Sequence, residues 1–506
     1  MKKYRILLMM SVVIMSLISC ETVDFGETND NHNGPSELNT GALLTAAQRR
    51  FVTVGGRPWL GNPNLYVQYR SQPSYSDPSR YAESAVDWQG LYVQTLINLQ
   101  DIIEISQDEL SNTMPAYTDN GSINNQMGIA RIMKVLIFKR LTDSYGDIPY
   151  TEALAGLEIQ SPAYTAQSEI YADFVTELQE ARDMMDVNEA GPTGDIIYGG
   201  DVASWKKFAN SLLLSVAMQM SDANESLAMS TFNEALSDAN GVIEAVEEEA
   251  WYFPVNVSTL VNPWTSFRPA DYNLSDYLTN SLQGVGDDYS NTARDSRIDI
   301  FSNEPDGTGL PYGLADYTGI GSSVKISLYL TAPESPFPWL TSSYVYLNRA
   351  EAAAKGWTSE DAEAMLEQGI LNSYESISTY WGSLNYLSSN YVQSQGLTPV
   401  DITGDAAAFA AARLSDAGNV GIEQVIGEEK WAALFSQGFD AWSEFRRTGF
   451  PLLTPSPNPL NAGPIPTRYI YPNQEQSVNN GNWSSAVGNL LPAEDRNTSR
   501  IWWDVE

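Results

Sequence analysis

The feature that most constrains the fold of this chain is a helical spacing of apolar residues, which recurs along much of its length. One clear example has acidic residues at intervening positions and apolar residues three or four apart, at Tyr171, Phe174, Leu178, Ala181 and Met185. Such spacing places the apolar side chains on one face of a helix and the charged side chains on the other. We therefore expect an amphipathic helix here, with one buried face.

The same spacing predicts further helices over residues 87–105, 123–141, 202–220, 229–246, 343–355, 359–380 and 422–438. Asp201 and Ser359 precede helical segments and are expected to be N-caps, because short polar side chains accept hydrogen bonds from the first turn. Successive helices of this length favour packing in tetratricopeptide-like pairs, although no regular repeat is legible. We expect a mainly α protein with little β structure.

Two stretches interrupt the helical pattern. Residues 250–337 are rich in Pro, Gly, Asn, Asp and aromatic residues, and residues 451–472 contain seven prolines. Long irregular segments in compact proteins commonly carry function, so the first stretch is expected to be a functional region. The second is expected to be an extended surface segment, because proline cannot donate a backbone hydrogen bond.

The amino terminus has the pattern of a bacterial lipoprotein. Basic residues at positions 2, 3 and 5 precede an apolar stretch from Ile6 to Ile18, and Ser19 precedes Cys20, the only cysteine of the chain. That stretch is too short to span a bilayer but suits a secretory signal. We expect residues 1–19 to be a signal peptide and the thiol of Cys20 to carry lipid. Residues 20–40 read as an acidic, flexible tether, and residues 41–506 as one domain.

Composition excludes several classes of function. The net charge of −35 disfavours nucleic acid, whose phosphates are bound by replacing counterions with Lys and Arg. The single histidine, His32, lies in the predicted tether, and the single thiol is assigned to lipid. A Ser-His-Asp triad, a cysteine nucleophile and a His/Cys zinc site are therefore not expected. A carboxylate pair of the glycosidase type remains open, because chance pairs are common among 63 acidic residues.

Five motifs follow one another in a fixed order along the chain. They are Leu141–Tyr150 (LTDSYGDIPY), Gly200–Leu212 (GDVASWKKFANSL), Tyr346–Ala352 (YLNRAEA), Gly438–Gly449 (GFDAWSEFRRTG) and Ile465–Pro472 (IPTRYIYP). Together they resemble the SusD/RagB family of outer-membrane nutrient-binding lipoproteins, and they span most of the chain beyond the tether.

The resemblance implies a fold, a location and a partner. It implies tetratricopeptide-like helix pairs supporting a loop-rich half, in a lipid-anchored protein at the surface of the outer membrane of a Gram-negative bacterium. It also implies a SusC-like TonB-dependent transporter as partner, for which the protein serves as a lid. The expected ligand is an oligosaccharide, or a peptide as in some members, and the expected activity is binding rather than catalysis.

Candidate ligand contacts follow from sugar chemistry. Sugars present apolar C–H faces, which stack on aromatic rings, and hydroxyls, which pair with Asn, Asp, Arg and Gln. Such residues gather in two irregular segments and in one proline-flanked motif. The candidates are Trp59, Tyr69, Tyr75, Arg80, Tyr81, Trp264, Arg268, Asp271, Tyr272, Asn273 and Trp339. Burial in the packing of its own loop is the competing explanation for each aromatic residue.

Alternative ligands and activities remain. A peptide ligand would need a groove offering backbone hydrogen bonds, and a surface glycosidase would need two aligned carboxylates. No cofactor is expected. A structural calcium ion is possible in chemical terms, because Asp287, Asp288, Asp295 and Asp299 supply hard oxygen ligands, but the spacing does not match an EF-hand and assigns no ligand set.

Overall fold

The computed structural model describes residues 38–53, 57–108, 112–156, 158–255, 261–286, 289–321 and 323–505. The compact unit discussed below is Thr40–Glu506. The predicted signal peptide, Cys20 and the predicted tether up to residue 37 lie outside the described residues, as do Asp287 and Asp288.

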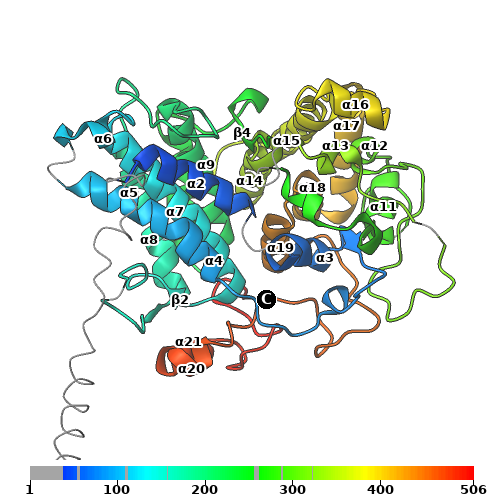
Figure 1. The fold of residues 1–506 in the computed structure, drawn as a ribbon. Coiled ribbons are helices and arrows are strands. Elements are labelled where there is room, and N and C mark those ends of the chain that lie inside the picture. Colours follow the sequence, from blue (N-terminus) through cyan, green and yellow to red (C-terminus); the bar gives the residue numbers. More distant parts are fainter. Residues whose placement is uncertain are drawn as a thin grey trace, which may run out of the picture. The chain divides into compact units, whose positions relative to one another are not determined.

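The first half of this unit is a stack of helices (Figure 1). Its elements are α2 (Thr40–Thr53), a π-helical turn η2 (Arg57–Gly61), α3 (Asn62–Tyr66), α4 (Gln89–Leu91), a π-helical turn η4 (Tyr92–Leu96), α5 (Ile97–Gln107), α6 (Pro115–Thr118), α7 (Ile123–Tyr145), α8 (Gln167–Met184), α9 (Val202–Gln219) and α10 (Glu225–Ser237). Consecutive long helices lie side by side, with α8 between α7 and α9, and with α9 against α10. Because α9 has neighbours on several sides, nearly all of its second half is buried.

The second half combines longer helices with short elements in loops. Its helices are α11 (Asp276–Gln283), α12 (Ile298–Phe301), α13 (Leu328–Thr331), α14 (Ser342–Ala354), α15 (Ala362–Ile377), α16 (Ser389–Gln395), α17 (Thr403–Val420), α18 (Ile422–Ala433), α19 (Gly438–Thr448), α20 (Glu475–Val478) and α21 (Asn480–Gly488). Helix α14 packs against α9, which joins the two halves into one apolar core. None of the described helices is long and apolar enough to cross a bilayer.

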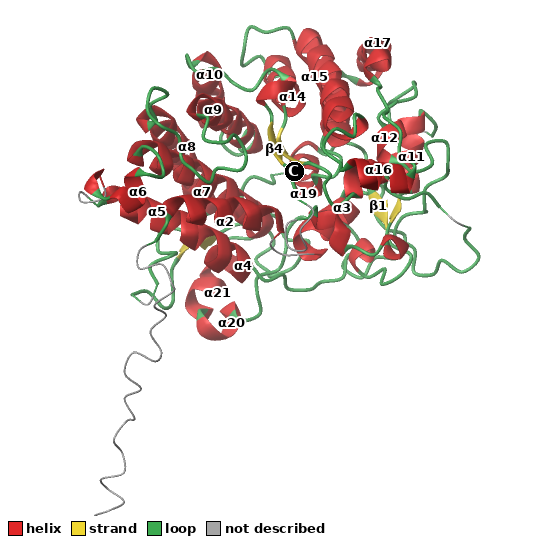
Figure 2. Cartoon of the chain, turned by 45° about the horizontal axis from the view of Figure 1, so that its top comes forward, coloured by secondary structure: helices red, strands yellow, loops and turns green. Residues whose placement is uncertain are grey.

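The strands of the described residues are short and form three antiparallel pairs (Figure 2). The pairs are β1 (Arg70–Ser71) with β5 (Asn273–Leu274), β2 (Ile148–Pro149) with β3 (Tyr164–Thr165), and β4 (Ala250–Tyr252) with β6 (Phe337–Leu340). Single 3-10 turns complete the loops, namely η3 (Pro78–Arg80), η6 (Val246–Glu248), η7 (Pro263–Ser266) and η8 (Pro269–Asp271), while the π-helical turn η9 (Ser378–Gly382) directly continues α15. The prediction of a mainly α fold with little β structure is confirmed.

The helix boundaries show where local signals succeed. Asp201 caps α9 as predicted, its carboxylate accepting from the Ala203 N–H at 3.0 Å. The predicted cap Ser359 is wrong. Helix α15 begins two residues later, because Asp361 accepts from the N–H groups of Glu363 and Ala364. The segment predicted over 229–246 is helical only to Ser237, after which the chain turns around Asp238.

A network of buried charges holds α18 among its neighbours. Arg297, immediately before α12, pairs with Asp295 at 2.6 Å and with Glu429 at 2.7 Å, and Arg413 of α17 pairs with Glu429 at 2.7 Å and with Glu428 at 2.6 Å. All five side chains are fully buried. An ion inside a protein is tolerated only when its partners replace water, so these pairs fix the relative positions of three segments.

A second group of buried charges continues from α18 to α14 and α19. Lys430 and Arg447 both pair with Glu351 at 2.6 Å, and Arg447 also pairs with Glu444 at 2.6 Å. Burial alone raises the pKa of Glu351, but Arg447 and Lys430 outweigh it and hold that pKa well below its usual range. Both glutamates are therefore ionised and paired at neutral pH.

The network predicts unequal effects for two nearby arginines. Replacing buried Arg297 with Met leaves Asp295 and Glu429 without their shared partner, and we expect a loss of about 3–5 kcal/mol in the free energy of unfolding. Replacing Arg294 with Met breaks a partly exposed pair with Asp299 and should cost less than about 1 kcal/mol. Chemical denaturation at pH 7 measures both. Equal midpoints for the two variants would contradict the structural role given to Arg297.

Candidate functional site

The β1–β5 pair brings together the two segments in which most ligand contacts were predicted. The strands are antiparallel with Ser71 opposite Asn273, so the residues after Ser71 and the residues before Asn273 leave the pair at the same end. We call loops 72–81 and 261–272, together with Asn273, the ladder face. Two segments about 190 residues apart in the chain therefore form one surface.

Loop 72–81 is fixed at both ends. Beyond the strand, Arg80 donates from Nε to the Asn458 carbonyl at 2.9 Å, and the Arg80 carbonyl accepts from the Leu460 N–H at 2.6 Å. The Tyr81 hydroxyl accepts from the Ser456 N–H at 2.9 Å. The proline-rich segment 451–472, predicted to be an extended surface segment, thus holds the end of loop 72–81. Arg80 and Tyr81 position the loop, and the Tyr81 ring is buried.

Tyr75 occupies the tip of the loop in a strained conformation. Its φ of 57° lies in the left-handed region, which costs a residue with a side chain roughly 1–3 kcal/mol, and its side chain is 69% exposed. Gln68 and Tyr81, close by in sequence, also have positive φ. Strain of this kind persists where the surroundings impose it and is common at binding sites. The fold therefore holds the ring of Tyr75 in solvent, four residues beyond the β1–β5 pair.

Loop 261–272 covers an arginine that sequence reasoning missed. The guanidinium of Arg70 lies 3.5 Å from the centre of the Trp264 ring, and both side chains are buried. Nε and Nη2 of Arg70 and Nε1 of Trp264 have no hydrogen-bond partner among the described residues. Burial lowers the pKa of Arg70 to about 9, so it stays charged at neutral pH. Its signal in the sequence is a lone cation between Tyr69 and Gln72 in a strongly acidic chain.

Some polar residues of this loop are exposed to solvent, and others are buried with hydrogen-bond or packing partners. Arg268 is 66% exposed, with Nε 3.8 Å from the buried carboxylate of Asp271. Asn273 is buried and is bonded to one neighbouring segment, because its amide donates to the Ser323 carbonyl at 3.0 Å and its oxygen accepts from Lys325 at 2.6 Å. Tyr272 is buried against Phe267, with ring centres 5.3 Å apart. Arg268 is thus the predicted contact of this loop that faces solvent.

Other predicted aromatic residues lie in the packing. Tyr69 donates its hydroxyl hydrogen to the Trp431 carbonyl, while Trp431 donates to the Val67 carbonyl at 2.9 Å. Trp59 donates to the Asp87 carbonyl at 3.2 Å and is almost completely buried. In this structure these rings hold the loops to the helices, and as ligand contacts they stay predictions.

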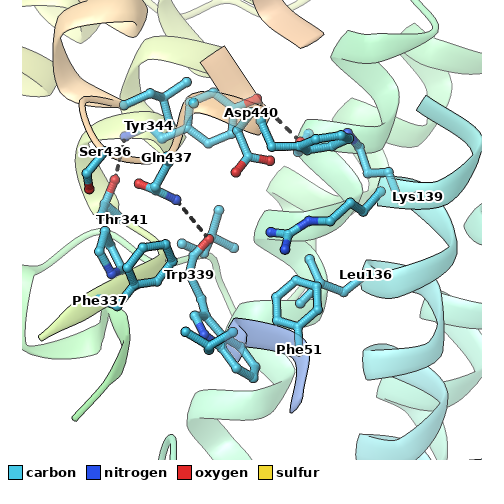
Figure 3. Close-up of a pocket in the computed structure, with 18 of the residues that line it drawn as sticks. Phe51, Leu136, Lys139, Phe337, Trp339, Thr341, Tyr344, Ser436, Gln437 and Asp440 are labelled. Atoms are coloured by element: carbon cyan, nitrogen blue, oxygen red, sulfur yellow. Dashed lines mark hydrogen bonds between the residues drawn. The ribbon is translucent and has the colours of Figure 1, made fainter. Parts of the chain in front are cut away.

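Trp59 and Trp339 both line an interior cavity. Figure 3 shows this cavity with Trp339 in its wall. Its walls include Phe51 and Leu136, and the charged residues of its lining are Lys139, Arg140 and Asp440. The cavity volume is about 50 Å³, which has room for about three to five water molecules at roughly 10–15 Å³ each and excludes a sugar ring.

The polar groups of this cavity suit hydration. Trp339 Nε1, Ser436 Oγ and Asn64 Oδ1 are buried without a hydrogen-bond partner among the described residues. The Arg140 guanidinium lies 4.1 Å from the centre of the Phe51 ring. Burial lowers the pKa of Arg140 and raises the pKa of Asp440, and each charge opposes the shift of the other. The cavity is therefore an internal polar site that ordered water can satisfy.

The acidic residues considered for calcium have other partners where the structure describes them. Asp295 is buried against Arg297, and Asp299 pairs with Arg294 at 2.5 Å. Among the described residues, no group of three or more His, Cys, Asp or Glu side chains is arranged to hold a metal ion.

A protein-family model matches most of the chain. The model, SusD-like_2, is described as "Starch-binding associating with outer membrane" and matches residues 32–472. Among curated proteins, no match to the chain was found.

Solved structures share the fold at low sequence identity. A chitin-binding protein superimposes with a TM-score of 0.76 at 24% identity, covering 92% of this chain and 100% of that one. A SusD-like protein described as Bacteroidetes AC2a gives 0.75 at 23%, covering 93% and 100%. A chitin-binding SusD homologue from Flavobacterium johnsoniae gives 0.71 at 23%, covering 92% and 98%. At this identity the likeness establishes the fold.

The ladder face predicts that two aromatic residues differ in their effect on stability. Trp264→Ala should lower the free energy of unfolding by about 3–5 kcal/mol, because it empties a buried site and removes the ring that covers Arg70. Tyr75→Ala should change it by less than about 0.5 kcal/mol, because the ring is in solvent. Thermal and chemical denaturation report both values. An unchanged midpoint for Trp264→Ala would show that this ring is not part of the packing.

Proposed function

The chain belongs to the SusD-like family of outer-membrane-associated binding proteins, and on this basis we propose that it captures an oligosaccharide at the cell surface and delivers it to a partner TonB-dependent transporter. In this proposal the protein is a lipoprotein anchored through Cys20 that acts as the lid of the transporter. The observation that carries the proposal is the match of the starch-binding family model over residues 32–472.

The structural relatives support a carbohydrate as the ligand class. Two of the similar structures are described as chitin-binding, and the family model as starch-binding. We propose binding without catalysis, in keeping with the binding role that these descriptions state. A peptide ligand is the alternative, and competition between oligosaccharides and peptides for the purified protein distinguishes the two.

The ladder face has the chemistry that a sugar requires. The exposed ring of Tyr75 can stack on the apolar face of a pyranose, and the exposed guanidinium of Arg268 can donate to its hydroxyls. Each aromatic contact contributes roughly 0.5–1.5 kcal/mol beyond burial. An open face of this kind supports affinities between micromolar and millimolar. A transporter that supplied an opposite wall would strengthen binding, because two weak half-sites would then act on one ligand.

Substitutions on the ladder face test the ligand site. Tyr75→Ala should weaken binding of chitohexaose or maltoheptaose by about 2- to 12-fold, the factor that corresponds to one lost aromatic contact. Arg268→Ala should add a further loss. Calorimetric titration measures the dissociation constant, and Tyr386→Ala, an exposed tyrosine outside both loops, is the control. The same affinity for all variants would place the ligand elsewhere.

A change at the predicted lipidation site tests the anchor. Cys20→Ser removes the thiol that would carry lipid, so the protein should move from the membrane fraction to the soluble fraction while its affinity for the oligosaccharide stays the same. Fractionation followed by immunoblotting measures the first, and calorimetry the second. Retention of the variant in the membrane fraction would remove Cys20 from the proposal, and a lower affinity would show that the cysteine acts on the ligand site.

A further inference from the structure

A groove lies on a part of the surface that the ladder face does not include. It is formed by α4 and η4, by the loop that follows β2, and by α20. Figure 1 shows α4, β2 and α20 in the same part of the fold, and Figure 2 shows α4 and α20 there as well. We call it the α4–α20 groove. It is lined by Trp88, Gln89, Tyr92, Val93, Ile97, Pro149, Ala153, Leu154, Gly156, Gln160, Pro162, Gln474, Glu475, Val478 and Asn479. None of these residues was predicted to contact a ligand.

The size of the groove suits a sugar unit. Its volume is about 320 Å³, against about 50 Å³ for the interior cavity. Sites for small ligands range from about 300 to 1,000 Å³. One sugar unit of a longer chain can therefore occupy the groove, whereas the interior cavity accommodates water.

The floor and walls of the groove are apolar and firmly held. The buried indole of Trp88 is surrounded by aromatic rings, including Tyr145 at 4.9 Å between ring centres, and Tyr92 donates its hydroxyl hydrogen to the Pro149 carbonyl at 2.6 Å. Val93 and Val478, in contrast, are 54% and 64% exposed. The groove thus leaves apolar surface in contact with water on a rigid support, which favours a ligand that has an apolar face.

Unused hydrogen-bonding groups surround this apolar surface. Gln89, Gln160 and Gln474 are exposed, and no side-chain hydrogen bond to another described residue is made by any of the three. Each side-chain amide can donate through its NH₂ group and accept through its oxygen, and each sugar hydroxyl can likewise donate and accept. Three amides beside an apolar floor are complementary to a ring that has hydroxyls at its edge and C–H groups on its face.

The groove is also nearly free of charge. Its lining contains no Lys, Arg or His, and its one carboxylate is Glu475. Oε2 of Glu475 accepts from the Tyr164 hydroxyl at 2.8 Å and from the Asn479 amide at 3.4 Å. In a chain with a net charge of −35, a lining with a single, engaged carboxylate favours a neutral ligand over an ionic one.

We propose that the α4–α20 groove is a second carbohydrate site, which takes a neutral sugar unit independently of the ladder face. The inference rests on the proposed function for the class of ligand, while the groove itself is defined by its own residues. With two separate sites, one polysaccharide chain, or two neighbouring chains, can engage the protein at two places, which raises its retention on a polymer above that of either site alone.

The experiment uses the Cys20→Ser full-length protein, with chitohexaose and maltoheptaose as probes. Tyr75→Ala/Arg268→Ala weakens the ladder face, so the binding that remains reports the groove. In that background, Val478→Trp should fill the groove, and Gln89→Ala/Gln160→Ala/Gln474→Ala should remove its amides. We expect each to reduce the remaining affinity by about tenfold or more, the factor expected for a lost apolar face or for lost hydrogen bonds.

Matched controls and outcomes separate the two hypotheses. Gln107→Ala/Gln393→Ala/Gln395→Ala removes three exposed amides outside the groove and should leave binding unchanged, and circular dichroism should show the same melting temperature for all variants. Remaining affinity that the groove variants do not change would overturn the second site and leave the proposed function intact. Groove variants that lost only co-purification with a transporter would identify a protein contact and also overturn it. Failure of the parent protein to bind either probe, or the corresponding insoluble polysaccharides, would count against the proposed function itself.

Discussion

Three consecutive charged residues of α18, Glu428, Glu429 and Lys430, are completely buried, and the loop-rich half of the protein is organised around them. Successive residues of a helix point about 100° apart, so the three side chains reach partners on different sides of α18. They pair with Arg413 on α17, with Arg297 before α12, and with Glu351 and Glu444 on α14 and α19. Buried ions tolerate few alternative arrangements, because a displaced charge loses both its partner and water. The positions of these helices therefore follow from charge pairing as well as from apolar packing.

The sequence predicted the parts of the fold that local patterns encode. Apolar spacing located α7, α8, α9, α14, α15 and α18. The prediction that Asp201 caps α9 is confirmed. The same reasoning chose Ser359 where Asp361 caps α15, because two polar residues close together are equivalent in a pattern and only the backbone path separates them. It gave no sign that Glu428–Lys430 is buried, since three charged residues in a row resemble a solvated helix face. Their partners come from distant parts of the chain, and a local pattern does not contain them.

The same limit applies to the candidate site. The aromatic residues of both predicted loops have similar local sequence, yet Tyr75 stands in solvent while Trp264 is buried over Arg70. The pairing of β1 with β5 decides which residues share a surface, and two-residue strands have no periodicity that a sequence could reveal. The α4–α20 groove was missed for the same reason, because its lining comes from three distant parts of the chain, which contain Trp88, Pro149 and Glu475. The resemblance of the five motifs to a family suggested the class of ligand, whereas the places where a ligand can lie depend on how distant segments come together in the fold.

The double attachment of loop 72–81 separates its tip, which carries the proposed ligand contact Tyr75, from its ends, which the fold holds in place. Its first residue follows a strand pair, and its last residues are held by the proline-rich segment through Asn458, Leu460 and Ser456. Because both ends are fixed, the entropic cost of closing the loop depends mainly on its length. Substitutions between Pro73 and Asp77 leave that length, and so that entropic cost, nearly unchanged. If the tip contacts the ligand as proposed, exchanging the few residues there can change the ligand preference without compensating changes in the core.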